Sequence, residues 1–313
     1  MPADTYAVKD FQTDVINDWC PGCGDFGILR SIQRALAEMN LPPHEVAVFS
    51  GIGCSGKTPH YIGTYGLHTL HGRVLTVATG AKLANHKLTV LAVGGDGDAY
   101  GIGAGYFVGA GRRNLNLTYI VFDNEVYGLT KGQASPTLDK GLRTKGMAEE
   151  AVTEGVNPIA LALSTGYTFI ARGYALDVKH LVSLIKQAIQ HRGSALVDVL
   201  QTCPTYNNLH TQAWFAGKDR TGGQSRLYHL EDTDYDPVVH NPDDPEEVVA
   251  KKVQALARSY EGGEQTPIGV FYQLNTLTLE DQLARRRSSL RTQAQVEISV
   301  YDRDVTPLLD QLT

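Results

Sequence analysis

The sequence predicts an α/β fold, with a doubly wound, mostly parallel sheet covered by helices and a loop-rich C-terminal extension. Through the first two thirds of the 313 residues, short apolar runs alternate with helical patterns. Strands that are buried on both faces form parallel sheets, since the helices between them cover both sides. Past about residue 205 the chain becomes polar and rich in turn-forming residues. We therefore expect an α/β domain over residues 1–205, and an extension over residues 206–313 that packs on this domain or on a partner subunit.

The strands of the predicted sheet are four short apolar runs. They are of the length expected for buried strands and are rich in valine and leucine. In a parallel sheet their carboxyl ends meet at one edge, where ligands usually bind. The runs lie at residues 46–50, 88–93, 117–122 and 195–200.

Two helices are predicted from their starting residues. Asp177 can cap a helix that Gly193 ends, because apolar residues between them recur with a 3.6-residue period. In the extension, Asp244 is a good cap and Pro245 suits the first turn. Glu247 stands where a capping box would return a hydrogen bond to the cap, so we expect that bond as well.

The composition excludes several classes of protein. Lys and Arg together number 28 against 34 Asp and Glu, so there is no basic excess and we expect no nucleic-acid partner. No apolar stretch approaches the length of a membrane helix, and the N-terminus lacks the features of a secretory signal. We therefore expect no membrane association and a cytoplasmic location. Thiols stay reduced in that compartment, so the cysteines are expected to be ligands rather than disulfides.

The four cysteines can complete one metal cage. Cys20 and Cys23 form a C-x-x-C, whereas Cys54 and Cys203 are isolated. Zinc sites usually combine two short pairs, and Pro204 after Cys203 is similar to the Cys-Pro usage of ferredoxins. This pattern favours a 4Fe-4S cluster over zinc. A zinc site and a redox-active C-x-x-C remain alternatives, although the second leaves Cys54 and Cys203 unexplained.

A metal-bound diphosphate site is predicted where two strands end. The run 88–93 leads into G-G-D-G-D, whose glycines let backbone amides approach phosphate oxygens. Asp96 lies in this turn, and Asn124 follows the next strand 28 residues later. Carboxylate and amide oxygens suit Mg2+, and adjacent strand ends line one crevice. The pattern indicates thiamine diphosphate, with two ordinary turns as the alternative.

Seven short motifs together resemble the β subunit of 2-oxoacid:ferredoxin oxidoreductases. The resemblance is dense over residues 12–210, and the joint set is highly specific. The motifs are W-C-P-G-C-G, G-I-G-C-S-G-K, H-T-L-H-G-R, G-D-G-D, R-R-N, Y-G-L-T-K-G-Q and A-S-P-T.

The resemblance implies a role for individual residues of this chain. It implies a 4Fe-4S cluster on the four cysteines, and Mg2+ on Asp96, Asn124 and the carbonyl of Val126. Lys57 would reach the substrate carboxylate, with a solvated surface lysine as the alternative, and Leu129 would lie at the reacting centre. Contacts to thiamine diphosphate would come from Ile52, Gly53, Cys54, Ser55, His71, Gly72, Arg73, Gly97, Asp98, Gly128 and Leu129.

The resemblance also implies a reaction and partners. The reaction is oxidative decarboxylation of a 2-oxoacid, 2-oxoglutarate or pyruvate, to CO2 and an acyl-CoA, with coenzyme A as co-substrate and ferredoxin as electron acceptor. We find no second α/β unit for the pyrimidine ring of the coenzyme, so we expect an α subunit, or an α/γ fusion, that carries it, and an (αβ)2 assembly. A non-oxidative thiamine diphosphate-dependent decarboxylase subunit and a zinc-stabilised α/β binding module are the alternatives.

Overall fold

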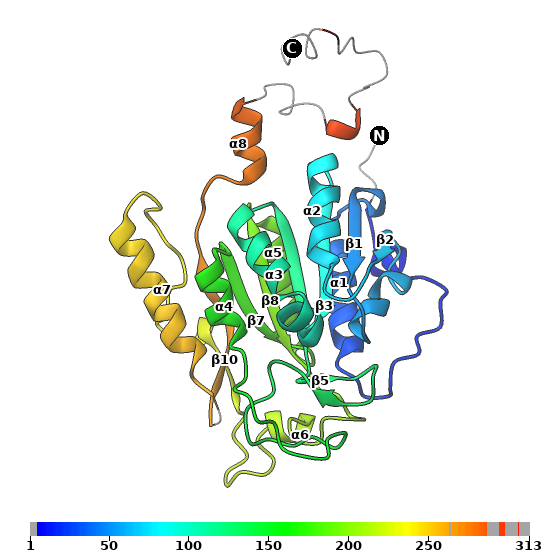
Figure 1. Cartoon of the computed structure of the whole chain (residues 1–313), viewed down its shortest axis with the longest axis vertical. Helices are drawn as coiled ribbons and strands as arrows, with labels where there is room; N and C mark the ends of the chain where they lie inside the picture. Colours follow the sequence, from blue (N-terminus) through cyan, green and yellow to red (C-terminus); the bar gives the residue numbers. More distant parts are fainter. Residues whose placement is uncertain (1–4, 263, 287–293, 298–305, 307–313) are drawn as a thin grey trace.

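The protein is built around one eight-stranded sheet (Figure 1). The computed structural model describes residues 5–262, 264–286, 294–297 and 306. The six strands from β2 to β7 run parallel, β10 is antiparallel to β7, and β9 is parallel to β10. The order across the sheet is β2 (Tyr65–His68), β1 (Val46–Ser50), β3 (Thr89–Gly95), β4 (Leu117–Asp123), β8 (Ser194–Leu200), β7 (Phe169–Tyr174), β10 (Thr266–Gln273) and β9 (Leu227–His229).

Helices cover both faces of this sheet. One face packs against α1 (Asp25–Glu38) and α5 (Val178–Gln190). The other face packs against α2 (Val74–Ala84), α3 (Ala104–Arg113), α4 (Pro158–Thr165) and α7 (Pro245–Ser259). The predicted fold class, a doubly wound and mostly parallel α/β sheet, is therefore confirmed.

Shorter elements connect these layers. A separate hairpin consists of β5 (Val126–Tyr127) and β6 (Gln133–Ala134). A π-helical turn, η4, precedes α3, and α6 and α8 lie in the C-terminal third of the chain. The bounds are η1 (Val8–Phe11), η2 (Pro43–Glu45), η3 (Ser55–His60), η4 (Gly97–Ile102), α6 (Gln212–Phe215), η5 (Leu230–Asp232), α8 (Leu279–Arg286) and η7 (Gln295–Glu297).

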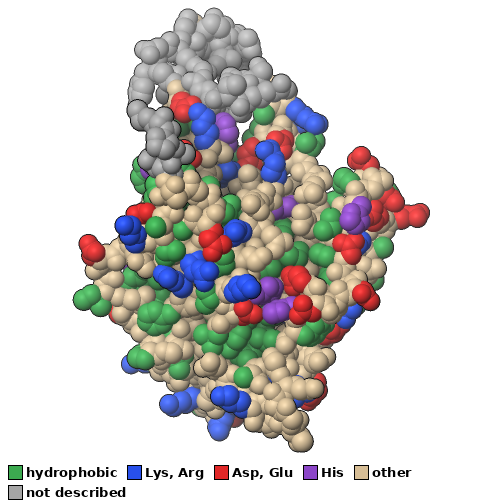
Figure 2. All heavy atoms as spheres, turned by 180° about the vertical axis from the view of Figure 1, so that it is seen from behind, with side chains coloured by type: hydrophobic (Ala, Val, Ile, Leu, Met, Phe, Trp, Pro, Cys, Tyr) green, Lys and Arg blue, Asp and Glu red, His purple; other side chains and the backbone are tan. Residues whose placement is uncertain are grey.

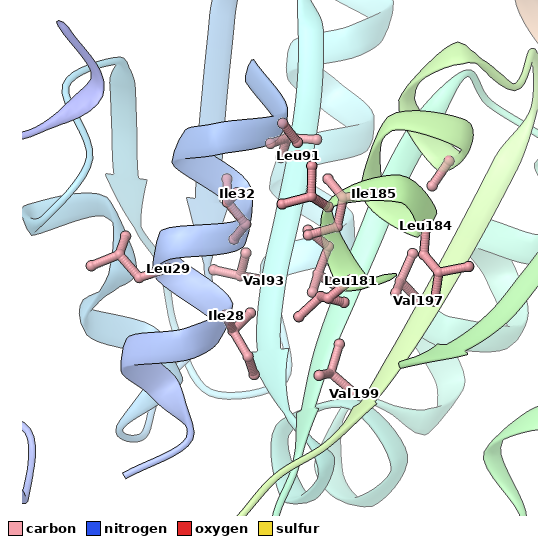
Figure 3. Packing of buried hydrophobic residues seen from close by; sticks show 14 of the residues in the cluster. Ile28, Leu29, Ile32, Leu91, Val93, Leu181, Leu184, Ile185, Val197 and Val199 are labelled. Carbon is pink, nitrogen blue, oxygen red and sulfur yellow. The ribbon is translucent and has the colours of Figure 1, made fainter. Parts of the chain in front are cut away.

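The core between the sheet and the first pair of helices is apolar and closely packed (Figure 3). Helix α1 contributes one row of side chains and α5 another, and they form one cluster with side chains of β3 and β8. Burial of each large aliphatic side chain stabilises the fold by roughly 1.5–3 kcal/mol. The labelled members are Ile28, Leu29 and Ile32 of α1, Leu181, Leu184 and Ile185 of α5, Leu91 and Val93 of β3, and Val197 and Val199 of β8.

The locally predicted elements agree with the structure, with one correction. All four predicted strands are present, and their bounds differ by at most two residues. Asp177 caps α5 by accepting a hydrogen bond from His180 N, and Asp244 caps α7 by accepting one from Glu246 N. The prediction of a capping box at this helix was wrong. The Glu247 carboxylate instead accepts hydrogen bonds from the amides of His240 and Asn241, because the preceding loop folds back over the first turn of α7.

The C-terminal third contributes to the same sheet. Strand β10 joins at the free edge of β7 and β9 joins beyond it, while α7 packs on α4 and β10. Among the described residues, no helix is both long and apolar enough to cross a membrane. Basic and acidic side chains are interspersed on the face seen in Figure 2.

A buried histidine at the end of α5 makes stability depend on pH. His191 Nε2 lies 2.8 Å from Thr168 Oγ1, while its Nδ1 is buried without a hydrogen-bond partner among the described residues. Burial lowers the pKa of His191 to about 4. Between this value and about 6.5 the unfolded chain binds a proton that the folded chain excludes. Stability is therefore lost as the pH falls through this window.

We expect this histidine to cost about 2 kcal/mol of unfolding free energy when the pH falls from 7.5 to 5. The difference should shrink in His191→Gln, whose amide does not titrate. Urea unfolding at both pH values checks this, with the exposed His44→Gln as the matched control. An equal acid-induced loss in His191→Gln and the wild type would contradict it.

Candidate active site

A cavity of about 170 Å³ lies at the carboxyl edge of the sheet, where the sequence predicted a ligand site. The segments that follow β1, β3, β4 and β8 all reach it. It is lined by Ile52, Gly53, Cys54, Ser55, His71, Gly95, Asp96, Gly97, Asp98, Phe122, Asn124, Val126, Tyr127, Gly128, Leu129, Thr130 and Gln201.

Asp98 holds three of these segments together. Its Oδ1 atom accepts hydrogen bonds from the amides of Ile52 at 2.9 Å and Gly72 at 2.8 Å. The same atom lies 2.8 Å from His71 Nδ1, so it fixes that ring against the cavity. Its Oδ2 atom is buried and makes no hydrogen bond within the described parts of the chain. One carboxylate thus positions the loop after β1 and the loop before α2.

Two glycines are required here by close packing. A Cβ atom on Gly51 would lie 2.0 Å from Asp98 Oδ2, and one on Gly97 would lie 2.1 Å from the Tyr127 ring. Gly97 is the first residue of the π-helical turn η4, directly after Asp96. Neither position therefore has room for a side chain, and at Gly97, which lines the cavity, only backbone is available to a ligand.

The predicted magnesium residues line the same cavity. Asp96 Oδ2 accepts hydrogen bonds from Ser135 Oγ, from Thr137 Oγ1 at 2.7 Å and from Glu125 N at 2.8 Å. Burial raises the pKa of Asp96, and the two hydroxyl groups act in the opposite direction. Asn124 Oδ1 accepts from Val126 N at 3.0 Å. The structure therefore brings to one cavity Asp96 and Asn124, predicted from the strand ends, and Val126, which the resemblance implies.

The four cysteines belong to three chain segments that hydrogen bonds tie together. Gly24 N donates to Thr202 O at 3.1 Å, which joins the C-x-x-C turn to the segment of Cys203. Trp19 Nε1 donates to the carbonyl of Cys54 at 2.8 Å. The Cys54 and Cys203 thiols both face Gly128, where a Cβ atom would lie 3.4 and 4.0 Å from their sulfurs. Cys54 also lines the cavity, so thiol cage and cavity share a wall.

Burial makes these thiols hard to ionise. It raises the pKa of Cys54 to about 12, and the charges of Asp25 and Cys203 act in the same direction. Burial likewise raises the pKa of Cys23 and of Cys203. Thiolates are the metal-binding form, so metal uptake has to displace these protons. The arrangement suits a cage that ionises when metal binds.

Three predicted residues are placed outside the cavity lining. The Lys57 ammonium lies 2.9 Å from Asp18 Oδ2, and Asp18 Oδ1 accepts a hydrogen bond from Tyr61. The Arg73 guanidinium lies over the Tyr106 ring, 4.6 Å from its centroid. Gly72 contributes through its amide to Asp98. Direct contacts of Lys57 and Arg73 with a ligand stay predictions.

Sequence reasoning missed several residues of the site. Gly95, Phe122, Tyr127, Thr130 and Gln201 line the cavity without having been predicted. Gln201 directly follows β8, so it could have been predicted from the rule that the carboxyl ends of parallel strands share one edge of the sheet. Ser135 and Thr137 lie in the A-S-P-T motif. Their hydrogen bonds to Asp96, which precedes them by 39 and 41 residues, depend on how the loop that carries the motif folds.

Comparisons with known proteins agree with this geometry. Residues 51–199 match the family model of the thiamine pyrophosphate enzymes, C-terminal TPP binding domain. Residues 203–288 match the model for the C-terminal part of the pyruvate ferredoxin oxidoreductase beta subunit. The 2-oxoacid:ferredoxin oxidoreductase subunit beta of Saccharolobus solfataricus is 53% identical over 277 residues, which is 87% of each chain. The subunit beta of oxidoreductase 1 from Aeropyrum pernix is 51% identical over 285 residues, 90% of this chain and 86% of that one.

A solved structure shares the whole fold. It is a 2-oxoglutarate:ferredoxin oxidoreductase from Magnetococcus marinus with 2-oxoglutarate, coenzyme A and succinyl-CoA bound. The similarity has a TM-score of 0.85 and 32% identity, and it covers 100% of this chain and 98% of that one.

The fold and the cavity at its carboxyl edge define an α/β domain of the thiamine pyrophosphate enzymes. The chain belongs to the family of 2-oxoacid:ferredoxin oxidoreductase β subunits. This confirms the resemblance drawn from the seven motifs, and with it the predicted class of enzyme.

Proposed function

We propose that this β subunit holds thiamine diphosphate with Mg2+ and a 4Fe-4S cluster side by side. With an α subunit it would carry out the coenzyme A-dependent oxidative decarboxylation of 2-oxoglutarate or pyruvate, with ferredoxin as acceptor. The observation that carries the proposal is the shared wall: Cys54 lines the cavity, and its sulfur and that of Cys203 both lie close to Gly128, which also lines it. Electrons released in the cavity would reach the cage without crossing the protein.

The cavity fits a metal-bound diphosphate. Asp96 and Asn124 offer the oxygen ligands that Mg2+ prefers, and the Val126 carbonyl completes the set we predict. Ser55 and Asp98 line the cavity, and Ser55 Oγ and Asp98 Oδ2 are buried without a hydrogen bond among the described residues. Such atoms normally have a partner. The Ser55 hydroxyl is suited to donate to a phosphate oxygen.

The thiol cage fits a cluster better than a single zinc ion. A tetrahedral zinc with bonds of about 2.3 Å needs sulfurs about 3.8 Å apart. In the part of the chain that the structure describes, no three of the thiols lie within 4.8 Å of one another. These thiols are therefore not preset for a single zinc ion, and we propose an iron-sulfur cube on Cys20, Cys23, Cys54 and Cys203.

The residues of this chain would prepare the site rather than perform the chemistry. Bound thiamine diphosphate supplies the electron sink for loss of CO2, and a cluster accepts electrons one at a time. Asp98 holds His71 and the amides of Ile52 and Gly72 in place, so the phosphate side of the cavity is preorganised. Leu129 covers the cavity near Gly128, and Lys57 stays our candidate for the substrate carboxylate, in competition with Asp18.

A partner subunit would close the cavity. Leu70 and Ile102 are 74% and 54% exposed beside the His71 and Gly72 turn, and Leu129 is 50% exposed. We propose that the pyrimidine-binding domain of an α subunit, or of an α/γ fusion, covers these apolar side chains, and that two such pairs form an (αβ)2 assembly. A cytoplasmic location fits a cage of reduced thiols.

Reconstitution with the α subunit tests this function. Under anaerobic conditions the complex, but not the lone chain, should reduce ferredoxin when given thiamine diphosphate, Mg2+, coenzyme A and a 2-oxoacid. A panel of 2-oxoglutarate and pyruvate identifies the preferred substrate. Aldehyde release that is independent of coenzyme A would instead indicate a non-oxidative decarboxylase. A colourless complex that does not bind thiamine diphosphate would indicate the zinc-stabilised module.

A further inference from the structure

A second group of metal-binding side chains lies far from the cavity, where the C-terminal third meets the first two thirds of the chain. Asp177 and His180 lie at the start of α5, and His229 is the last residue of β9. One ligand atom from each lies within 4.8 Å of the others. Glu231, in η5, places Oε2 3.5 Å from His180 Nε2. None of the four residues lines the cavity of the active site.

The His180 ring is enclosed but not satisfied. Its side chain is only 14% exposed, and neither ring nitrogen makes a hydrogen bond of normal geometry to any described residue. The ring lies against that of His229, with centroids 4.4 Å apart. Burial of a polar ring whose nearest carboxylate, Glu231, makes no hydrogen bond of normal geometry with it is unfavourable. A ligand that accepts the lone pair of a His180 nitrogen would remove this cost.

The distances within the group of three suit a small cation. His229 Nε2 lies 3.0 Å from Asp177 Oδ2, and one ligand atom of His180 lies within 4.8 Å of one from each of them. Four donors in a tetrahedron with bonds of about 2.0–2.1 Å around zinc lie about 3.4 Å apart. Two imidazoles and one carboxylate match the borderline preference of Zn2+ better than that of Mg2+ or Ca2+, which favour oxygen alone.

We propose that Asp177, His180 and His229 bind one Zn2+ ion that fastens the C-terminal third of the chain to helix α5. Strand β9 has three residues at the edge of the sheet, and it pairs with β10 alone among the described strands. A metal that joins its last residue to α5 would hold this edge in place. The role is structural, since the site lies away from the cavity and joins two parts of the fold.

Metal analysis of the anaerobically purified αβ complex tests this proposal. We expect one equivalent of zinc per β chain, in addition to the iron. His180→Gln and His229→Gln should each bind zinc at least about tenfold more weakly and keep their iron. The matched control is His240→Gln, since His240 pairs with one carboxylate, Asp236, at 2.8 Å and belongs to no such group among the described residues. It should keep its zinc.

X-ray absorption at the zinc edge of the wild-type complex provides a second readout that needs no variant. Nitrogen and oxygen neighbours without sulfur are expected. Sulfur neighbours would place the zinc in the cysteine cage, which would overturn this proposal and the proposed cluster together. Absence of zinc, no increase in melting temperature on adding Zn2+, or equal zinc content in His229→Gln and the wild type would overturn this proposal alone.

Discussion

Replacement of Asp96 by asparagine is expected to weaken Mg2+-dependent binding of thiamine diphosphate at least about 100-fold, and to lower turnover by at least as much. The change removes the only carboxylate among the proposed magnesium ligands. The amide oxygen of asparagine can still accept from Ser135, Thr137 and the Glu125 amide, so the loop should keep its fold. Calorimetric titration of the reconstituted complex with thiamine diphosphate, with and without Mg2+, measures the effect.

Asp139→Asn is the matched control for this experiment. Asp139 lies two residues beyond Thr137 in the same loop, but it is exposed and does not line the cavity. Binding should be unchanged in this variant. If Asp96→Asn bound the coenzyme with normal Mg2+ dependence, Asp96 would not be a metal ligand. Loss of binding in both variants would point to damage of the loop instead.

The parts of the fold and site that sequence predicted are those fixed by local rules. Asp177 caps α5 as predicted, because a cap needs only its neighbours in sequence. Asp96 and Asn124 line one cavity because the carboxyl ends of adjacent parallel strands share an edge, whatever the loops do. The four thiols were predicted to form one cage because a metal cage needs four ligands. In the structure, hydrogen bonds from Trp19 and Gly24 join their segments.

What sequence could not predict depends on long-range packing. Strand β10 starts at Thr266 and pairs with the distant β7, and no turn signal specifies that partner. Lys57 was assigned to a substrate, but its nearest carboxylate, Asp18, comes from a loop 39 residues earlier. His229 meets Asp177 across 52 residues and lies in a segment whose composition predicted loops. Each of these three features depends on a contact between distant residues that forms only once the sheet has folded.

Replacement of Cys203 by serine separates the two cofactors, since this thiol faces the cage and does not line the cavity. We expect the reconstituted complex to lose most of its iron and visible absorbance, and to reduce ferredoxin at least about 100-fold more slowly. The reason is that a serine hydroxyl replaces one of four thiolate ligands. Binding of thiamine diphosphate should stay within about twofold of the wild type, because the cavity wall keeps Cys54. Iron and sulfide analysis, the visible spectrum and coenzyme titration measure these effects.

Asn208→Ser, in the same loop, is exposed and serves as the control that should retain the cluster. The zinc alternative makes a different prediction for the same pair of proteins. The cage would then hold zinc in the wild type, Cys203→Ser would release it, and neither protein would be coloured. If Cys203→Ser kept its iron and its rate of ferredoxin reduction, this thiol would not be a ligand and the proposed cluster would have to be abandoned. Loss of coenzyme binding together with iron would mean instead that the cage supports the cavity wall through the hydrogen bonds from Trp19 to Cys54 and from Gly24 to Thr202.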